Sequence, residues 1–75
     1  MTWNHRVVRH MEPNKAAWYA IHEVHYKDGS PTMVTENAVA AGGETVEELR
    51  EVLIMQRRAL SQPVLDYDAF SPGVT

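Results

Sequence analysis

The fold is decided by the stretch Gly42-Gly43-Glu44-Thr45-Val46-Glu47-Glu48-Leu49-Arg50-Glu51, which carries the signals of a helix start. Thr45 is the expected N-cap, and Glu48, three residues later, can return a side-chain hydrogen bond to the Thr45 backbone N–H. Glu44, Glu47 and Glu48 place negative charge at the positive end of the helix dipole. The stretch therefore divides the chain into a sheet half before it and a helix half after it.

Three strands are expected in the sheet half, over residues 3–11, 17–26 and 31–36. The first two are rich in aromatic and β-branched side chains and are separated by Pro13-Asn14, which is turn chemistry. The second and third are separated by Asp28-Gly29, a pair that supplies the positive backbone angles of a tight hairpin. These signals predict an antiparallel meander.

The register of the third strand depends on the length of the hairpin loop. If Asp28-Gly29 is a two-residue loop, Val24 faces Met33 and His22 faces Thr35. A one-residue slip or bulge at Ser30 is left open as an alternative. Alternation along the strands then places one set of side chains on the face expected to form the core. This set is Trp18, Ala20, His22, Val24, Tyr26 and Met33.

The helix half combines one amphipathic helix with a short tail. A stripe of side chains at helical spacing is expected to lie on the sheet, and the helix is expected to end near Ser61, because Pro63 disfavours helical geometry in the residue before it. The stripe consists of Val46, Leu49, Val52, Leu53, Gln56 and Leu60. Residues 64–70 alternate apolar and acidic side chains, which fits either a docked fourth strand or a partner-binding arm. Residues 71–75 are expected to be disordered.

The expected architecture is therefore α+β, with the element order β-β-β-α in a single domain of residues 1–70. A three-stranded antiparallel sheet, or a four-stranded one if the tail joins it, is packed on one face by a single C-terminal amphipathic helix. A chain of 75 residues buries only about 60% of its unfolded surface, so help from a partner is expected.

Composition narrows the classes of function. There is no cysteine, so disulfides and thiolate metal sites are not available. No apolar run approaches the roughly 20 residues of a membrane span, and the N-terminus lacks the apolar core of a signal peptide. A cytoplasmic protein without a membrane segment is the resulting expectation.

Charge is divided unevenly between the two halves. The net charge is -3, which disfavours a general nucleic-acid binder. Residues 1–27 carry four basic and two acidic side chains together with all four histidines, whereas the rest carries three arginines against eight acids. This asymmetry predicts attraction between the sheet half and the helix half, or between neighbouring subunits.

The sequence gives little indication of a catalytic site or a metal site. His22-x-x-His25 resembles half of a metal site, but residues three apart on a strand point to opposite faces. A site built from His22 and a histidine of the first strand, such as His5, is the alternative. Serines lie at turns, the helix end and the tail, with no partner that would make a nucleophile. We therefore expect no enzyme, no cofactor and no metal site.

Single-stranded nucleic-acid binding is the alternative function. The first strand interleaves aromatic and basic side chains, which can stack on bases and neutralise phosphates. The candidate residues are Trp3, Arg6, Arg9 and Trp18. The same pattern also arises in an edge strand that uses arginine to discourage aggregation.

Protein binding is the favoured function. Ile54 and Met55 fall outside the sheet-facing stripe, and the second sheet face is partly apolar at Tyr19 and Ile21. Such misplaced apolar surface on a chain short of core predicts a homodimer or a protein partner. The interface candidates are Ile54, Met55, Glu51, Arg58, Tyr19 and Ile21. The expected function is a small non-enzymatic interaction module.

Several phrases of the sequence resemble a group of short uncharacterised bacterial proteins over nearly the whole chain. They are WNHRVVRH, WYAIHEVHY, GGETVEELRE and QPVLDYDAF. The resemblance implies a fold but no activity or cofactor, and small proteins of this kind often travel on mobile elements.

The chain is more loosely similar to the small sheet-and-helix domain of HicB-type antitoxins, whose helix opens with a phrase such as GETVEEL. That domain binds a small toxin protein, and fuller members add a DNA-binding segment. The Trp-rich first strand, with no obvious second helix or DNA-binding extension, departs from that pattern, so the resemblance implies protein binding only.

Overall fold

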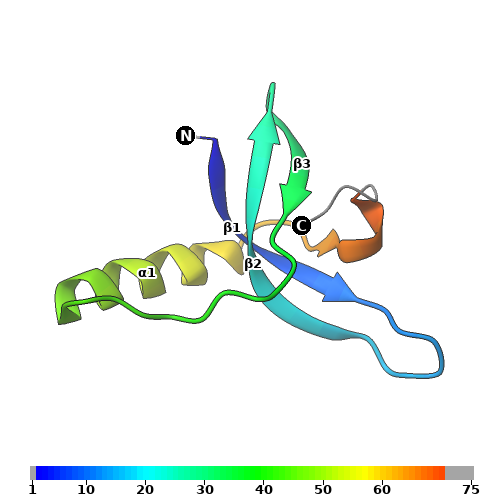
Figure 1. The fold of residues 1–75 in the computed structure, drawn as a ribbon, viewed down its shortest axis with the longest axis horizontal. Coiled ribbons are helices and arrows are strands. Elements are labelled where there is room, and N and C mark those ends of the chain that lie inside the picture. The colour runs from blue at the N-terminus through cyan, green and yellow to red at the C-terminus, as the bar shows by residue number, and fades with distance from the viewer. Residues whose placement is uncertain (1, 71–75) are drawn as a thin grey trace.

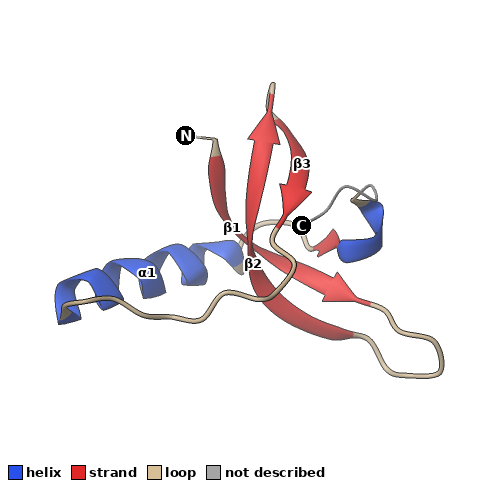
Figure 2. Cartoon of the chain, viewed as in Figure 1, coloured by secondary structure: helices blue, strands red, loops and turns tan. Residues whose placement is uncertain are grey.

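The computed structural model describes residues 2–70, and the expected disorder of residues 71–75 lies outside the described residues. Within residues 2–70 the chain forms four strands, one α-helix and one short 3-10 helix (Figures 1 and 2). In chain order they are β1 (Trp3–His10), β2 (Trp18–Lys27), β3 (Ser30–Val34), α1 (Val46–Ala59), β4 (Leu65–Asp66) and η1 (Tyr67–Ala69). The expected α+β class, with one sheet and one helix after it, is confirmed.

The sheet has the strand order β3-β2-β1-β4. β1 and β2 pair antiparallel, from Trp3 opposite His25 to His10 opposite Trp18, and β3 pairs antiparallel with the other edge of β2. β4 pairs parallel with β1, with Val8 opposite Leu65. The tail therefore supplies the fourth strand, but the expectation of a wholly antiparallel sheet is wrong. A parallel neighbour needs a long connection, and the helix provides the return.

The hairpin between β2 and β3 has the expected two-residue loop. Lys27 lies opposite Ser30, and both loop residues have positive φ, 53° at Asp28 and 81° at Gly29. The register then shifts between Tyr26 and His25, so that Val24 pairs with Val34. The expected Val24–Met33 and His22–Thr35 pairs are therefore wrong, because β3 has an extra residue, Thr32, between its pairs with Tyr26 and His25. A bulge was the open alternative, but it lies at Thr32 and not at Ser30.

The core lies on the face that alternation assigns to it. Val8, Val24 and Val34 are fully buried there, and His22 beside them is also at 0% exposure. Val34 takes the place expected for Met33, while Trp18 and Met33 are each 44% exposed. Partly buried residues packed against the core are Tyr26, Leu65, Tyr67 and Phe70.

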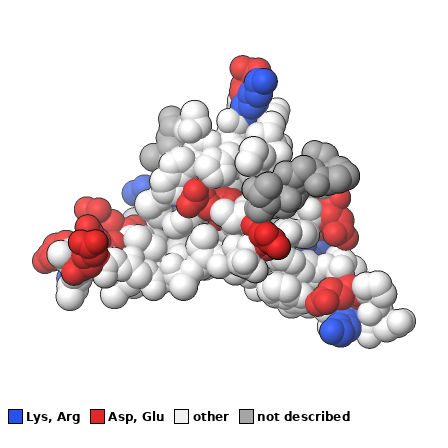
Figure 3. Space-filling view, viewed as in Figure 1, with Lys and Arg blue, Asp and Glu red and all other residues white. Residues whose placement is uncertain are grey.

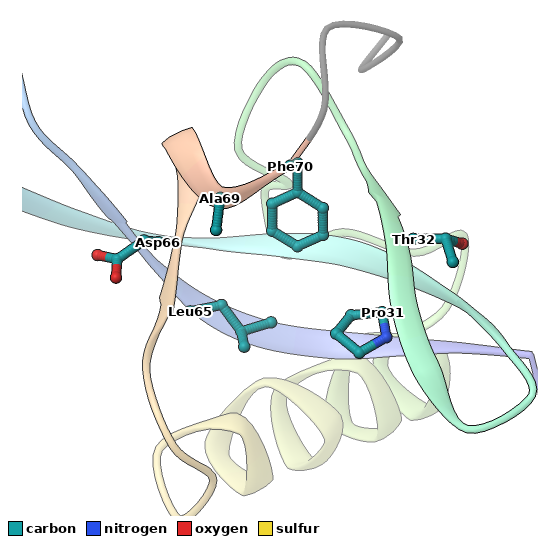
Figure 4. A pocket seen from close by; sticks show the side chains of 6 residues that line it. All are labelled: Pro31, Thr32, Leu65, Asp66, Ala69 and Phe70. Carbon is teal, nitrogen blue, oxygen red and sulfur yellow. The ribbon is translucent and has the colours of Figure 1, made fainter.

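The core face is covered by the tail and not by the helix. Leu65 on β4 and Phe70 after η1 point toward Pro31 on β3, the opposite edge of the curled sheet (Figure 4). An open pocket of about 450 Å³ separates these two edges. The sheet thus curls around its valines like an incomplete barrel, with the tail closing part of the gap.

The helix starts as expected. The Thr45 hydroxyl accepts the Glu48 backbone N–H at 3.1 Å, and the Glu48 carboxylate accepts the Glu44 N–H at 3.0 Å, one residue before the expected Thr45 N–H. Gly43 is needed at this turn, because a Cβ there would lie 2.9 Å from the Glu48 Cβ. The helix ends at Ala59, with the Leu60 N–H donating to the Arg57 carbonyl.

The helix does not lie across the sheet. Its C-terminal half meets β1, while its N-terminal half projects away from the strands (Figure 1). The radius of gyration is accordingly 13.0 Å, against about 11 Å expected for a compact chain of this length. The expected contact stripe is right at Val52 and Gln56, which are partly buried, and wrong at Val46, Leu53 and Leu60, which are 66%, 49% and 71% exposed. The side turned to the protein consists of these two residues together with Met55 and Ala59, which the stripe did not include.

Candidate functional site

The main candidate site is the exposed apolar side of α1. We define the helix seam as Val46, Leu49, Leu53 and Leu60. Leu49 is partly buried, and Val46, Leu53 and Leu60 are 66%, 49% and 71% exposed, so residues 2–70 leave most of the seam uncovered. Exposed single apolar residues are ordinary on protein surfaces, but a row of them on one helix indicates an interaction surface.

The opposite side of the helix explains why the seam faces solvent. Met55 and Ala59 line an open groove of about 450 Å³ together with Asn4 and His5 of β1. Ala59 is buried, and its small side chain lets the helix approach the strand closely. Since Ala59 faces β1, residues on the far side of the helix, Leu53 among them, face away from it.

The expected interface residues do not form one surface. Ile54 is 46% exposed on the helix, whereas Met55 is partly buried in the groove beside His5. Tyr19 is 57% exposed on β2, and Ile21 is partly buried there. Glu51 and Arg58 are both exposed on α1. The structure therefore keeps Ile54, Glu51 and Arg58 as surface residues of the helix, and separates them from the sheet residues.

The helix carries opposite charges at its two ends. Glu47 and Glu48 lie in its first turn, and Arg57 and Arg58 lie in its last turn. Figure 3 shows acidic side chains gathered at the end of the molecule where α1 begins. This arrangement suits the helix dipole.

The nucleic-acid candidates are not brought together. Arg6 is 8% exposed, and its guanidinium donates to the Tyr26 hydroxyl at 2.8 Å and to the Pro63 carbonyl at 2.7 Å. Arg9 donates to the Asp66 carboxylate at 2.6 Å, and that carboxylate raises the pKa of Arg9. Trp3 and Trp18 lie at opposite ends of the β1–β2 pair. Both arginines are thus engaged within the chain.

The Arg9–Asp66 pair also shows where the charge asymmetry acts. The basic first strand is joined to the acidic tail, because β4 runs beside β1 with Arg9 opposite Asp66. The sequence predicts attraction between the sheet and the helix or between subunits. The Arg9–Asp66 ion pair lies between the sheet half and the tail of the helix half, where it supports the parallel register.

A histidine pair forms a second cluster. His10 and His22 approach within 2.8 Å through their Nε2 atoms, and the Nδ1 of His22 lies 2.9 Å from the Thr35 carbonyl. A carbonyl only accepts, so His22 Nδ1 carries the proton and His10 Nε2–H donates to the bare His22 Nε2. The His10 ring is stacked between Trp18 and Tyr67 at centroid distances of 4.0 and 4.6 Å. Burial lowers the pKa of His22, and the nearby His10 lowers it further, against a raising effect of the Thr35 hydrogen bond.

The geometry of this pair is that of a hydrogen bond. Two nitrogens on one tetrahedral zinc lie about 3.3 Å apart when each Zn–N bond is about 2.0 Å. The observed 2.8 Å is shorter, and residues 2–70 hold no group of three or more His, Asp or Glu side chains placed around an ion. The alternative metal site of the sequence analysis pairs His22 with His5. In the structure Arg6 lies opposite His22, and the ring that meets the His22 ring is that of His10. The stacking residues Trp18 and Tyr67 carry no sequence signal that predicts this cluster.

Between residues 2 and 70, no helix combines the length and the apolar content needed to cross a bilayer. No protein-family model, curated protein or solved structure matches the chain.

Proposed function

We propose that this chain is a non-enzymatic protein-interaction module whose binding surface is the helix seam. The observation that carries the proposal is the exposure of the seam, with 66% at Val46, 49% at Leu53 and 71% at Leu60. Full burial of one such side chain contributes about 1.5–3 kcal/mol, so covering the seam offers a partner substantial free energy. The partner is a second copy of the chain or another small protein with an apolar helix-binding surface.

The position of the helix supports the same reading. A helix that served only the fold would turn its most apolar side to the sheet, because helical stability in small domains comes mainly from packing of that side. Here Val52, Met55, Gln56 and Ala59 are turned to the protein, while Leu53 and Leu60 remain 49% and 71% exposed. The helix is therefore anchored at its C-terminal end and presents the rest of its length to solvent.

Nucleic-acid binding receives less support from the geometry. Phosphate contacts require arginines that can exchange a counterion for a phosphate. Arg6 is buried, and Arg9 is already paired with Asp66. We therefore do not extend the proposal to nucleic acid.

A photoreactive amino acid at position 53 tests the proposal in cells of the native host. The matched control carries the same amino acid at position 27, an exposed site at the far end of β2. We expect a covalent protein adduct at position 53, and a much lower yield at position 27. Equal yields at the two positions, or no adduct at position 53, would reject the seam as a binding surface.

A further inference from the structure

We propose that the first residues of β1 bind an extended peptide as an added strand, with an acidic side chain of that peptide seated in the groove between β1 and α1. We define the β1 edge as the edge of β1 that faces away from β2 at residues 3–5. The groove is lined by Asn4, His5, Met55, Arg58, Ala59 and Gln62. This surface is separate from the helix seam, so the inference goes beyond the proposed function and does not depend on it.

The backbone hydrogen bonds between β1 and β2 come from alternate residues of β1. The Tyr26 N–H donates to the Thr2 carbonyl at 2.7 Å, so these two opposed residues form a hydrogen-bonded pair. Bonded and non-bonded pairs alternate along an antiparallel ladder. Asn4 is therefore also bonded to β2, whereas Trp3 and His5 turn their N–H and C=O groups to the other edge.

That other edge has no strand beside residues 3–5. β4 pairs with β1 only at Val8 and Arg9, and Figure 1 shows the start of β1 without a strand on the side away from β2. No backbone group of residues 2–70 pairs there with Trp3 or His5. An extended peptide presents its own N–H and C=O groups with the same two-residue period, so it is the ligand that matches this edge.

The groove lies along the same edge. Asn4 and His5 are consecutive on a strand and point to opposite faces, yet both line the groove, and no residue of β2 does. A space that is reached from both faces of β1, and not from β2, lies at the free edge of the strand. Its volume of about 450 Å³ is ample for one long side chain of an added strand.

Polar groups at the groove lack partners. His5 is 9% exposed, and its Nδ1 atom is buried without a hydrogen bond among residues 2–70. The Nε2 atom of Gln56, three residues before Ala59, is unpaired in the same way. Buried polar atoms are rarely left unpaired in native structures, and such atoms call for an explanation such as a ligand. Since His5 lines the groove and its Nδ1 is closed off, Nε2 is the ring nitrogen left to meet that ligand.

The charge of the groove selects an acidic side chain. Arg58 is exposed, and among residues 2–70 the ion pairs do not include it. The lining contains no aspartate or glutamate, and Met55 and Ala59 give it an apolar wall. A glutamate of the peptide can lay its methylene groups on that wall and bring its carboxylate to the Arg58 guanidinium, which is a charge-assisted contact. A lysine at the same place would be repelled.

Titration of the isotope-labelled chain with short peptides, followed by NMR, tests the proposal. The probe is acetyl-Thr-Val-Glu-Val-Thr-amide, and its matched control has glutamine in place of glutamate. In the free chain we expect the amide protons of Trp3 and His5 to exchange rapidly with solvent and that of Asn4 to be protected. The glutamate peptide should shift and protect the first two. The glutamine peptide should bind up to about fivefold more weakly, as expected for loss of one exposed ion pair. No shift at millimolar peptide, or protection of Trp3 and His5 in the free chain, would overturn the proposal.

Two further controls test the strand geometry and the charge. Only one edge of an added strand faces β1, so N-methylation of one alternate set of peptide residues should abolish binding, and methylation of the other set should preserve it. Equal effects of the two patterns would overturn strand addition. Arg58→Gln should remove the preference for the glutamate peptide. Arg57→Gln, an exposed neighbour that does not line the groove, should retain it. A preference that survives Arg58→Gln would reject the groove as the place of the acidic side chain.

Failure of this inference can be told apart from failure of the proposed function. Peptide-induced shifts confined to Leu49, Leu53 and Leu60 would reject the β1 edge and would leave the helix seam as the binding surface. A missing photoadduct at position 53, together with protection of Trp3 and His5 by the glutamate peptide, would reject the seam and support the β1 edge.

Discussion

Arg6→Ala is the substitution that most directly tests how the sheet, the helix and the tail are joined. The guanidinium of Arg6 reaches from the middle of β1 to the Tyr26 hydroxyl, and it also reaches the Pro63 carbonyl just after the helix. The Tyr26 hydroxyl in turn donates to the Asn4 side chain at 2.8 Å. One cation therefore holds the end of the helix connection against the sheet.

The expected loss follows from these contacts. A hydrogen bond to a charged group contributes about 1.5–3 kcal/mol, and Arg6→Ala removes two. The loss is reduced because Pro63 is exposed, so its carbonyl can bind water, and because the buried Nε of Arg6 has no partner among residues 2–70. We expect a decrease of about 2–4 kcal/mol in the free energy of unfolding. A chain of this size has only about 4–11 kcal/mol in total, so the melting temperature should fall by at least about 8 °C.

Urea and thermal unfolding, followed by circular dichroism at one low protein concentration, measure this change. Arg9→Ala is the matched control, since it removes the same side chain three residues later on the same strand. The Arg9–Asp66 pair is about half exposed at both side chains, and exposed pairs contribute little, so its effect should be much smaller. Arg6→Lys keeps the charge without the planar fork, and it should fall between the natural chain and Arg6→Ala. If Arg6→Ala were as stable as Arg9→Ala, the Arg6 guanidinium would not join the sheet to the segment after the helix. Arg6 would then again be a candidate for contact with a nucleic acid.

Further predictions concern the histidine pair, the core and the hairpin. The lowered pKa of His22 means that the folded chain binds fewer protons, so stability should be complete above about pH 6.5 and decline as pH falls below it. Urea midpoints at about pH 7.5 and about pH 5 should differ less in His22→Gln than in the natural chain. Val24→Ala should cost about 2–3 kcal/mol in urea unfolding, whereas Val46→Ala in the monomer should stay within about 0.5 kcal/mol. Gly29→Ala should cost roughly 1 kcal/mol, because alanine is strained at the φ of 81° that Gly29 adopts.

The features that the sequence predicts correctly are local. Asp28-Gly29 needs only its own backbone angles to make the hairpin, and Thr45 needs only the N–H of Glu48 to start the helix. The alternation of His22 and Val24 likewise assigns the core face without knowledge of its cover. Each of these depends on residues within a few positions of one another, where steric and hydrogen-bond rules act almost independently of the rest of the chain.

The features that the sequence misses depend on competition between distant segments. A helical wheel identifies the most apolar side of α1. It gives no information on whether another segment of the chain, such as the tail, already covers the core face of the sheet. The bulge in β3 is set by whether Met33 or Val34 fits the core, which depends on the tail above it. The approach of His10 to His22 depends on a strand register that the Pro13-Asn14 turn leaves open. These outcomes are tertiary, and no local pattern decides them.

A physical reason explains why the tail, and not α1, covers the core face. Both α1 and the tail carry apolar side chains that could cover Val8, Val24 and Val34. The helix has satisfied its own backbone hydrogen bonds, so it could offer the sheet only apolar contact. The tail offers Leu65, Tyr67 and Phe70, and β4 also pairs with the edge of β1 that would otherwise be unpaired. Unpaired strand edges are a liability, so the segment that both buries the valines and pairs that edge is favoured. The helix is thereby left to contact β1 through its C-terminal half alone, and its seam stays exposed.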